Sequence, residues 1–340
     1  MSQVSGVPRV TYAVRGKTIN QWAWFWIEGL GGTLEEAESD EFGNQRWEIL
    51  MGDFVTDLVS AAEGTRSSKV KDFLKTFGDH SVMSIDYAVR KPLNDQIDVP
   101  GTPLGSHQGL NLVHQDQVNQ RRGFSLLKRV DHVTYAVTPE TIEEVAAFWL
   151  KELEGTLVLK NDDVRPDDPS DSMMLWGIVL NQGITAEELG IALVAGIDRD
   201  QVSQVTRFVQ KKGPNIVQHV AYDVGEMASF RKYFEGEFGA NLLSETLVVP
   251  DGFGGHVRQV FGRGYESGNA AEVGFPEFVE RLSGSGKGFT NAAGEGLYEK
   301  VKRVSESGDD TPIVDFSRMP PDWEPPKPRI PIPATSVPPR

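Results

Sequence analysis

The sequence predicts an α+β fold built from paired βαβββ modules that form two open, barrel-like halves. The first observation is an internal repeat. The pentapeptide VTYAV stands at 10–14 and again at 133–137, and the same spacing relates FWI at 25–27 to FWL at 148–150. A repeat of this length indicates a duplicated domain rather than a solenoid. The second observation is the order of the elements, which is strand, helix and strands in both copies.

Composition narrows the class of protein. A chain of 340 residues is long enough for two domains with sizeable cores. The net charge of −15 argues against nucleic acid and anionic membranes as partners, because both require a basic surface. Cysteine is absent, which excludes disulfides, thiolate nucleophiles and Cys-ligated metal sites. The sequence shows no long apolar run and no N-terminal secretion signal, so a cytoplasmic location is expected.

The first half begins with a strand at 8–14, where β-branched and aromatic residues dominate. An aromatic helix at 20–28 follows, and its tryptophans favour packing between modules over a ligand cage. Strands are expected within 45–55 and at 81–89, with a helix at 70–77 between them. The polar segment 91–122, rich in Gly, Pro, Asn and Gln, is expected to link the two halves.

The second half repeats this order. Alternation of apolar residues predicts strands, and apolar residues at helical spacing predict helices. Strands are expected at 130–137, 157–160, 172–180, 190–197, 215–224, 256–261 and 271–279, and helices at 142–153, 201–211 and 226–238. Pro276 suggests an edge or a bulge in the last strand. The segment from Pro320 onward contains too many prolines for a helix or a central strand, so an extended tail is expected.

Two histidines occupy matching places in this pattern. His132 shares a strand face with Thr134 and Ala136, and His219 opens a similar strand. A single histidine of this kind is more typical of a core, but two on matched strands favour a metal site. Glu277, a carboxylate in an apolar run, is the expected third ligand, and Glu272 is the competing choice. Two His and one carboxylate form the facial triad of non-haem Fe(II) oxygenases.

These motifs resemble the vicinal oxygen chelate superfamily, and within it the 4-hydroxyphenylpyruvate dioxygenase family. VDHV at 130–133, QHVA at 218–221, FPE at 275–277 and Arg281 carry the resemblance, which extends over about residues 8–305. It implies the glyoxalase/bleomycin-resistance/dioxygenase fold. A metal-free module pair would occupy 1–122, a catalytic module pair with a lid helix would occupy 123–305, and a Pro-rich tail would follow at 306–340. His132, His219 and Glu277 would bind Fe(II).

The resemblance also implies a substrate pocket. Gln218 precedes the second His, and Gln259 and Phe261 match a Gln-x-Phe motif on a late strand. Phe289 matches a lid aromatic. The two glutamines would orient the substrate, and the two phenylalanines would flank an aromatic ring. The implied activity is oxidative decarboxylation and hydroxylation of a 2-oxo acid, 4-hydroxyphenylpyruvate or a relative, with O₂. A homo-oligomer is compatible with the sequence.

Two departures from the family pattern leave room for a different reaction. The family's Pro-Leu-Asn stands here as Ala192-Leu193-Val194, and the separation of 58 residues between His219 and Glu277 is closer to that of extradiol dioxygenases. A catechol ring-cleaving enzyme would need an acid–base residue, for which His256 or Tyr265 could serve. A non-catalytic small-molecule-binding protein and a glyoxalase- or epimerase-like enzyme that uses no O₂ are also compatible with this fold.

Overall fold

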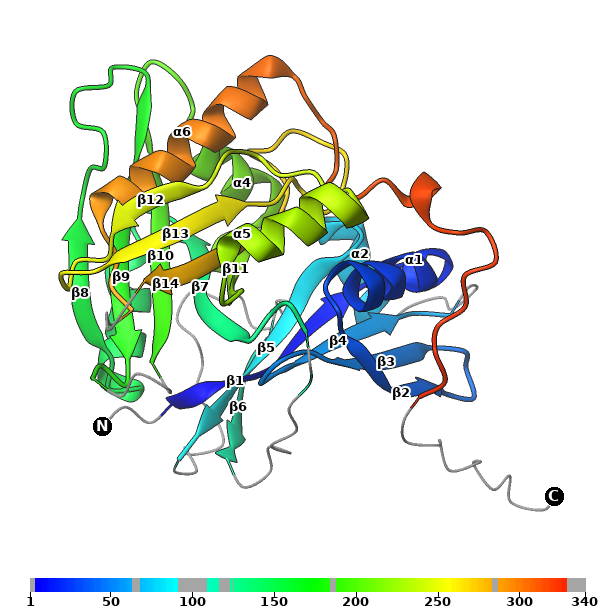
Figure 1. Cartoon of the computed structure of the whole chain (residues 1–340). Helices are drawn as coiled ribbons and strands as arrows, with labels where there is room; N and C mark the ends of the chain where they lie inside the picture. The colour runs from blue at the N-terminus through cyan, green and yellow to red at the C-terminus, as the bar shows by residue number, and fades with distance from the viewer. Residues whose placement is uncertain are drawn as a thin grey trace.

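Two twisted β-sheets, one in each half of the chain, organise the molecule (Figure 1). The computed structural model describes residues 4–62, 68–90, 109–115, 123, 125–183, 188–282 and 287–328. Most of the expected linker and residues 329–340 of the tail lie outside the described residues. No helix among the described residues is long and apolar enough to cross a membrane.

The first sheet has the strand order β2-β3-β4-β1-β5-β6. Its helices are α1 (Ile19–Trp24), which continues as a π-helical turn over Phe25–Gly29, and α2 (Lys69–Phe77). The strands are β1 (Val4–Ala13), β2 (Thr33–Ser39), β3 (Gln45–Leu50), β4 (Val55–Ser60), β5 (Ser81–Val89) and β6 (Gly109–His114). Strand β6 falls within the segment that the sequence predicted to be a linker.

The second sheet has the order β12-β13-β14-β11-β7-β10-β9-β8 and is curled (Figure 1). Its strands are β7 (Arg129–Val137), β8 (Thr156–Asn161), β9 (Asp171–Leu180), β10 (Leu189–Asp198), β11 (Ile216–Asp223), β12 (Leu247–Pro250), β13 (His256–Phe261) and β14 (Phe275–Leu282). Its helices are α3 (Ile142–Ala147, extended by Phe148–Glu152), α4 (Gln204–Lys212), α5 (Met227–Arg231, extended by Lys232–Phe238) and α6 (Asn291–Ser307).

The two sheets follow the same topology around their central strands. β1 pairs in parallel with β4 and antiparallel with β5, and β7 pairs in the same way with β10 and β11. β6 joins β5 in parallel, as β14 joins β11. In the described part of the first half, nothing corresponds to β12 and β13, so that sheet stays more open. The predicted α+β fold of paired βαβββ modules is confirmed.

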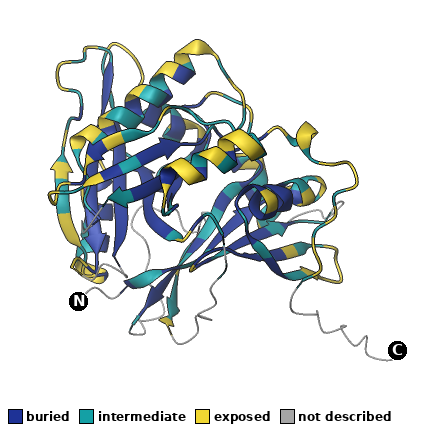
Figure 2. Ribbon diagram, viewed as in Figure 1, coloured by how far each residue is buried: buried dark blue, intermediate teal, exposed yellow. Residues whose placement is uncertain are grey.

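Aromatic residues fill the interface between the halves, as the sequence predicted for the first helix. Trp22 and Trp26 are buried, and the Tyr12 hydroxyl lies 2.5 Å from that of Tyr222 in the second half. The Trp26 indole donates to Nε2 of His80, a fully buried histidine whose pKa burial lowers well below the usual value. A neutral histidine stacked between aromatic rings belongs to the core. In Figure 2 the buried residues lie mainly on the strands and on parts of the helices.

The last strand differs from its prediction. β14 begins at Phe275 rather than 271, because residues before it form a turn in which the Glu272 amide donates to the Asn269 carbonyl. Pro276 lies in a central strand between β13 and β11, so the expected edge or bulge is wrong. Pro276 is the second residue of the strand, and its carbonyl still accepts a hydrogen bond from the Gly262 amide.

The tail packs on the body as far as the structure describes it. Ile313 and Val314 are buried, and the indole of Trp323 donates to Glu28 at 3.1 Å. In Figure 1 the tail, drawn in red, leaves α6 and passes beside α1. Residues 320–328 form no helix or strand, as expected from the prolines, but they include a turn in which the Trp323 amide donates to the Pro320 carbonyl. A short 3-10 turn at Phe316–Arg318 precedes them.

Candidate metal centre

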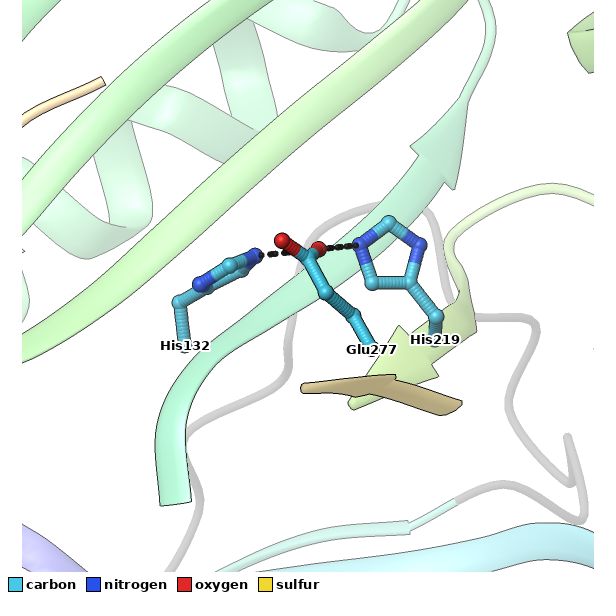
Figure 3. Close-up of side chains that lie close together, drawn as sticks. All are labelled: His132, His219 and Glu277. Carbon is cyan, nitrogen blue, oxygen red and sulfur yellow. Dashed lines mark ion pairs between the residues drawn. The ribbon is translucent and has the colours of Figure 1, made fainter. Parts of the chain in front are cut away.

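Three neighbouring strands bring two histidines and a glutamate together in the second half (Figure 3). His132 lies on β7, His219 on β11 and Glu277 on β14. β11 lies between the other two strands, and its Ala221 is in register with both His132 and Glu277. The register therefore holds the imidazole and the carboxylate at one level of the sheet. The sequence predicted this triad, and the structure places its three side chains side by side.

The three side chains face one another inside the protein. Nε2 of His132 and Nε2 of His219 each lie 3.2 Å from Oε2 of Glu277, and all three ligand atoms lie within 4.8 Å of one another. The exposed fractions are 7% for His132 and 3% for each of the other two. A buried carboxylate is costly unless it is paired or binds a metal. The donor set of two imidazoles and one carboxylate suits Fe(II) and leaves coordination positions open.

Hydrogen bonds on the far side of each ring set its tautomer. Nδ1 of His132 lies 3.0 Å from Oδ1 of Asp131, and Nδ1 of His219 lies 3.3 Å from Oε1 of Gln218. Both partners are oxygen acceptors, so we assign the proton to Nδ1 and the lone pair to Nε2. The lone pair of His219 then faces the Glu277 carboxylate at 3.2 Å. A nitrogen lone pair and a carboxylate at this distance repel unless a proton or a metal ion lies between them, and a bound metal would satisfy this condition. The Thr134 hydroxyl also lies 2.9 Å from Nε2 of His219.

Charge within the cluster shifts two pKa values in opposite directions. Burial disfavours the imidazolium of His132, but the charge of Glu277 and the hydrogen bonds to Asp131 and Glu277 outweigh it and raise the pKa to about 8. Burial would raise the pKa of Glu277, but His132 and His219 lower it to about 2. The pKa of His219 is lowered, mainly by burial. At neutral pH the metal-free site therefore holds one extra proton, on His132.

Metal binding is expected to release this single proton. Because the pKa of His132 is raised to about 8, the apparent affinity for a divalent metal should rise about tenfold per pH unit up to about pH 8 and level off above it. Titration with Co(II) at several pH values measures this slope. An affinity that does not change with pH over this range would contradict the assigned proton, and a slope of two protons would require His219 to titrate as well.

A mainly apolar cavity opens in front of the triad. It encloses about 820 Å³ of space between its lining atoms, part of it open to solvent. Phe275 stacks on His219 with ring centroids 4.9 Å apart, and Phe289 meets His132 edge-on at 5.3 Å. Phe289 packs against Gly177. A Cβ at position 177 would lie 2.5 Å from the Phe289 ring, so a larger residue would not fit there.

The four pocket residues predicted from the sequence all line this cavity. They are Gln218, Gln259, Phe261 and Phe289. A register shift in β11 between Val217 and His219 allows Gln218 and its neighbour both to face the cavity. Gln259 donates to the Ala293 carbonyl at 3.3 Å, so it also contacts the start of α6.

The competing residues lie elsewhere. Glu272 is half-buried and pairs with Lys211 at 2.6 Å, away from the triad. His256 is exposed at the start of β13. Tyr265 is buried in the aromatic interface between the halves, where it contacts Tyr12 and His80. Neither candidate acid–base residue for ring cleavage lines the metal cavity.

Gln204 is a cavity residue that sequence reasoning missed. It lies at the start of α4 and is 4% exposed. Its amide nitrogen donates to the Tyr298 carbonyl at 3.1 Å, whereas its Oε1 has no hydrogen-bond partner among the residues that the structure describes. The available signal was its position beside Val205 and four residues before Phe208, on the apolar face of the predicted helix.

A buried charge cluster behind His132 was also missed, apart from Arg281. Asp131 is fully buried and accepts two hydrogen bonds from Arg281, at 2.8 and 2.7 Å. Lys287 lies 2.8 Å from the same carboxylate. Burial favours the neutral acid, but these two cations hold the pKa of Asp131 well below its usual value. The imidazole of His132 is thus held by an ionised carboxylate.

Comparison with solved structures identifies the architecture. No family model matches the sequence, and no curated protein matches it either. A triple mutant of 4-hydroxymandelate synthase from Streptomyces coelicolor superimposes with a TM-score of 0.68 at 16% identity, covering 89% of this chain and 99% of that one. A fusion of a xylose isomerase-like TIM barrel with 4-hydroxyphenylpyruvate dioxygenase gives a TM-score of 0.59 at 16% identity, over 89% of this chain and 53% of the fusion. The chain therefore has the same fold as 4-hydroxymandelate synthase, and the comparison agrees with the fold of paired modules expected from the sequence.

Proposed function

We propose that the chain is an Fe(II)-dependent dioxygenase of the 4-hydroxyphenylpyruvate dioxygenase type, which decarboxylates and hydroxylates a 2-oxo acid with O₂. The observation that carries the proposal is the convergence of His132, His219 and Glu277 at the end of an apolar cavity. The shared fold with 4-hydroxymandelate synthase supports it. His132, His219 and Glu277 would hold Fe(II), which supplies the redox chemistry and binding positions for the 2-oxo acid and O₂.

The surrounding residues would orient the substrate and exclude water. Phe261, Phe275 and Phe289 give the metal end of the cavity aromatic walls, which suit the flat side chain of an aryl 2-oxo acid. Ala192 and Val194, on β10, form an aliphatic wall of the cavity. The Gln218 carboxamide keeps His219 in the tautomer that presents Nε2. No protein nucleophile is required.

The free oxygen of Gln204 indicates what the substrate carries. An unpaired buried acceptor is costly, and a ligand that donates a hydrogen bond removes the cost. We propose that the substrate is a 2-oxo acid whose side chain bears a hydroxyl or another donor. An aryl 2-oxo acid with a ring hydroxyl, such as 4-hydroxyphenylpyruvate, meets this description. Ala192 and Val194, which also line the cavity, offer no polar partner for that group.

Replacing Gln204 with methionine tests this assignment. The substitution keeps the approximate size and removes the acceptor, so affinity for a hydroxyl-bearing 2-oxo acid should fall about tenfold, the equivalent of one hydrogen bond. Affinity for the same acid without the hydroxyl should change little. Calorimetric titration of both ligands into the metal-loaded protein gives the comparison. An equal loss for both ligands would show that Gln204 has only a packing role.

The proposed activity itself is tested by O₂ uptake. Metal-free protein is loaded with Fe(II) and offered a panel of aryl and alkyl 2-oxo acids and catechols. We expect O₂ uptake with a 2-oxo acid and none in the His219→Ala variant. Uptake with catechols alone would assign the ring-cleaving reaction instead. No uptake with any compound, despite tight metal binding, would reject both oxygenase functions and leave a binding protein or a non-redox enzyme.

A further inference from the structure

Lys287 places a buried ammonium group next to the support of the first metal ligand. The residue is 1% exposed and lies between β14 and α6. Its Nζ lies 2.8 Å from Oδ2 of Asp131 and donates to the main-chain carbonyl of the same residue at 3.0 Å. Asp131 in turn accepts from Nδ1 of His132. Two hydrogen-bonding steps therefore separate Lys287 from the imidazole expected to bind the metal.

The backbone of Lys287 is also held. Its amide donates to Oε2 of the buried Glu188 at 2.9 Å, and the other carboxylate oxygen of Glu188 accepts from the Gly183 amide at 2.6 Å. The next residue, Gly288, packs so closely on the Asp251 carbonyl that a Cβ would not fit. The ammonium and the backbone are thus fixed by different partners, which gives this short segment a defined position.

The same segment carries the aromatic wall of the cavity and the start of α6. Phe289 meets His132 edge-on at 5.3 Å. Thr290 caps α6 by accepting from the Ala293 amide and donates to the Pro250 carbonyl at 2.9 Å. His132 is therefore contacted twice by this segment, through Asp131 on its Nδ1 side and through the Phe289 ring.

We propose that Lys287 is a positioning residue. It couples the position of residues 287–290, and with them the start of α6, to the orientation of His132. A metal bound at the triad fixes His132 and so Asp131, the anchor of Lys287. When residues 287–290 are in this position, they in turn keep the His132 imidazole in the orientation that binds the metal. Coupling of this kind is reciprocal, so metal binding and seating of the segment stabilise one another.

The first test compares two lysine variants. Lys287→Met keeps the aliphatic stem and removes the ammonium, and we expect the dissociation constant for Zn(II) to rise about tenfold or more. Lys302→Met is the matched control. Lys302 lies on α6 and pairs with another buried carboxylate, Asp171, at 2.6 Å, but neither residue contacts the triad. Its Zn(II) affinity should stay within about twofold of wild type. Equal effects of the two variants would overturn the proposal.

The second test is decided by the wild-type protein, so it stands even if Lys287→Met fails to fold. Hydrogen exchange of wild-type protein is measured with and without Zn(II). We expect the metal to slow exchange in the first turns of α6, and this effect to be lost in Lys287→Met. No metal-dependent protection of α6 in wild type would overturn the coupling. Zn(II) is redox-inactive and no substrate is present, so the outcome is independent of whether the proposed dioxygenase reaction is correct.

Discussion

Replacing Glu277 with glutamine is expected to raise the dissociation constant for Fe(II) by more than about 100-fold while the chain stays folded. Loss of a residue that only hydrogen-bonds to a metal ligand already lowers metal affinity by about 10–100-fold. Glu277 is itself a ligand, and it is the anionic member of the triad. The amide has the same shape but no charge to balance a divalent ion. Anaerobic equilibrium titration, with near-UV circular dichroism to check folding, measures the effect.

Glu272→Gln is the matched control for this experiment. The two glutamates are close in the sequence, but Glu272 lies in a turn and pairs with Lys211. Its removal is expected to leave the metal dissociation constant within about twofold of wild type, because no contact to the metal or to its ligands is lost. A large effect at Glu272 together with a small one at Glu277 would show that the third ligand is wrongly assigned.

Replacing Asp131 with alanine is expected to destabilise the metal-free protein by about 3–5 kcal/mol, since it leaves the cations of Arg281 and Lys287 buried without their partner. The carboxylate has a pKa well below its usual value in the folded state. Its contribution is therefore complete above the pKa of the unfolded chain, about 4, and is lost only as the pH falls below it. Urea unfolding at neutral pH measures the difference.

The exposed pair of Asp72 with Lys75 provides the comparison for that measurement. Both side chains are well exposed, so Asp72→Ala should cost less than about 1 kcal/mol. If Asp131→Ala cost no more than this control, the buried cluster would not be the support that His132 requires. The same variant should also bind metal more weakly, because Nδ1 of His132 would lose its acceptor.

Most of the fold could be predicted for two reasons. Apolar and polar residues alternate clearly in the strand sequences, and the internal repeat shows that the order of strands and helices is duplicated. His132 and His219 could be predicted because the motifs around them are local. Strand β6 was hidden in a polar segment, and β12 is only four residues long, so neither offered a pattern to detect. Pro276 suggested an edge or a bulge because its nitrogen cannot donate a hydrogen bond to a neighbouring strand. The sequence does not show that its carbonyl accepts one from the Gly262 amide instead.

Gln204 and Lys287 show why part of the site could not be predicted. Both residues are ordinary in the sequence, and their importance depends on partners far away along the chain: Tyr298 for Gln204, and Asp131 for Lys287. Burial of a polar side chain, and the loss or gain of its partner, are properties of tertiary packing. The choice between Glu277 and Glu272 depended in the same way on the point at which β14 begins.

A turnover under ¹⁸O₂ with Fe(II)-loaded protein and a hydroxyaryl 2-oxo acid tests the proposed function most directly. The reaction consumes one O₂ and one 2-oxo acid, breaks the bond between the keto carbon and the carboxylate, and releases one CO₂. We expect both labelled atoms to appear in one product, one in its new carboxylate and one in a new hydroxyl, with unlabelled CO₂ released in equal amount. Label in a ring-opened product without CO₂, or no label in any product, would contradict the proposed reaction.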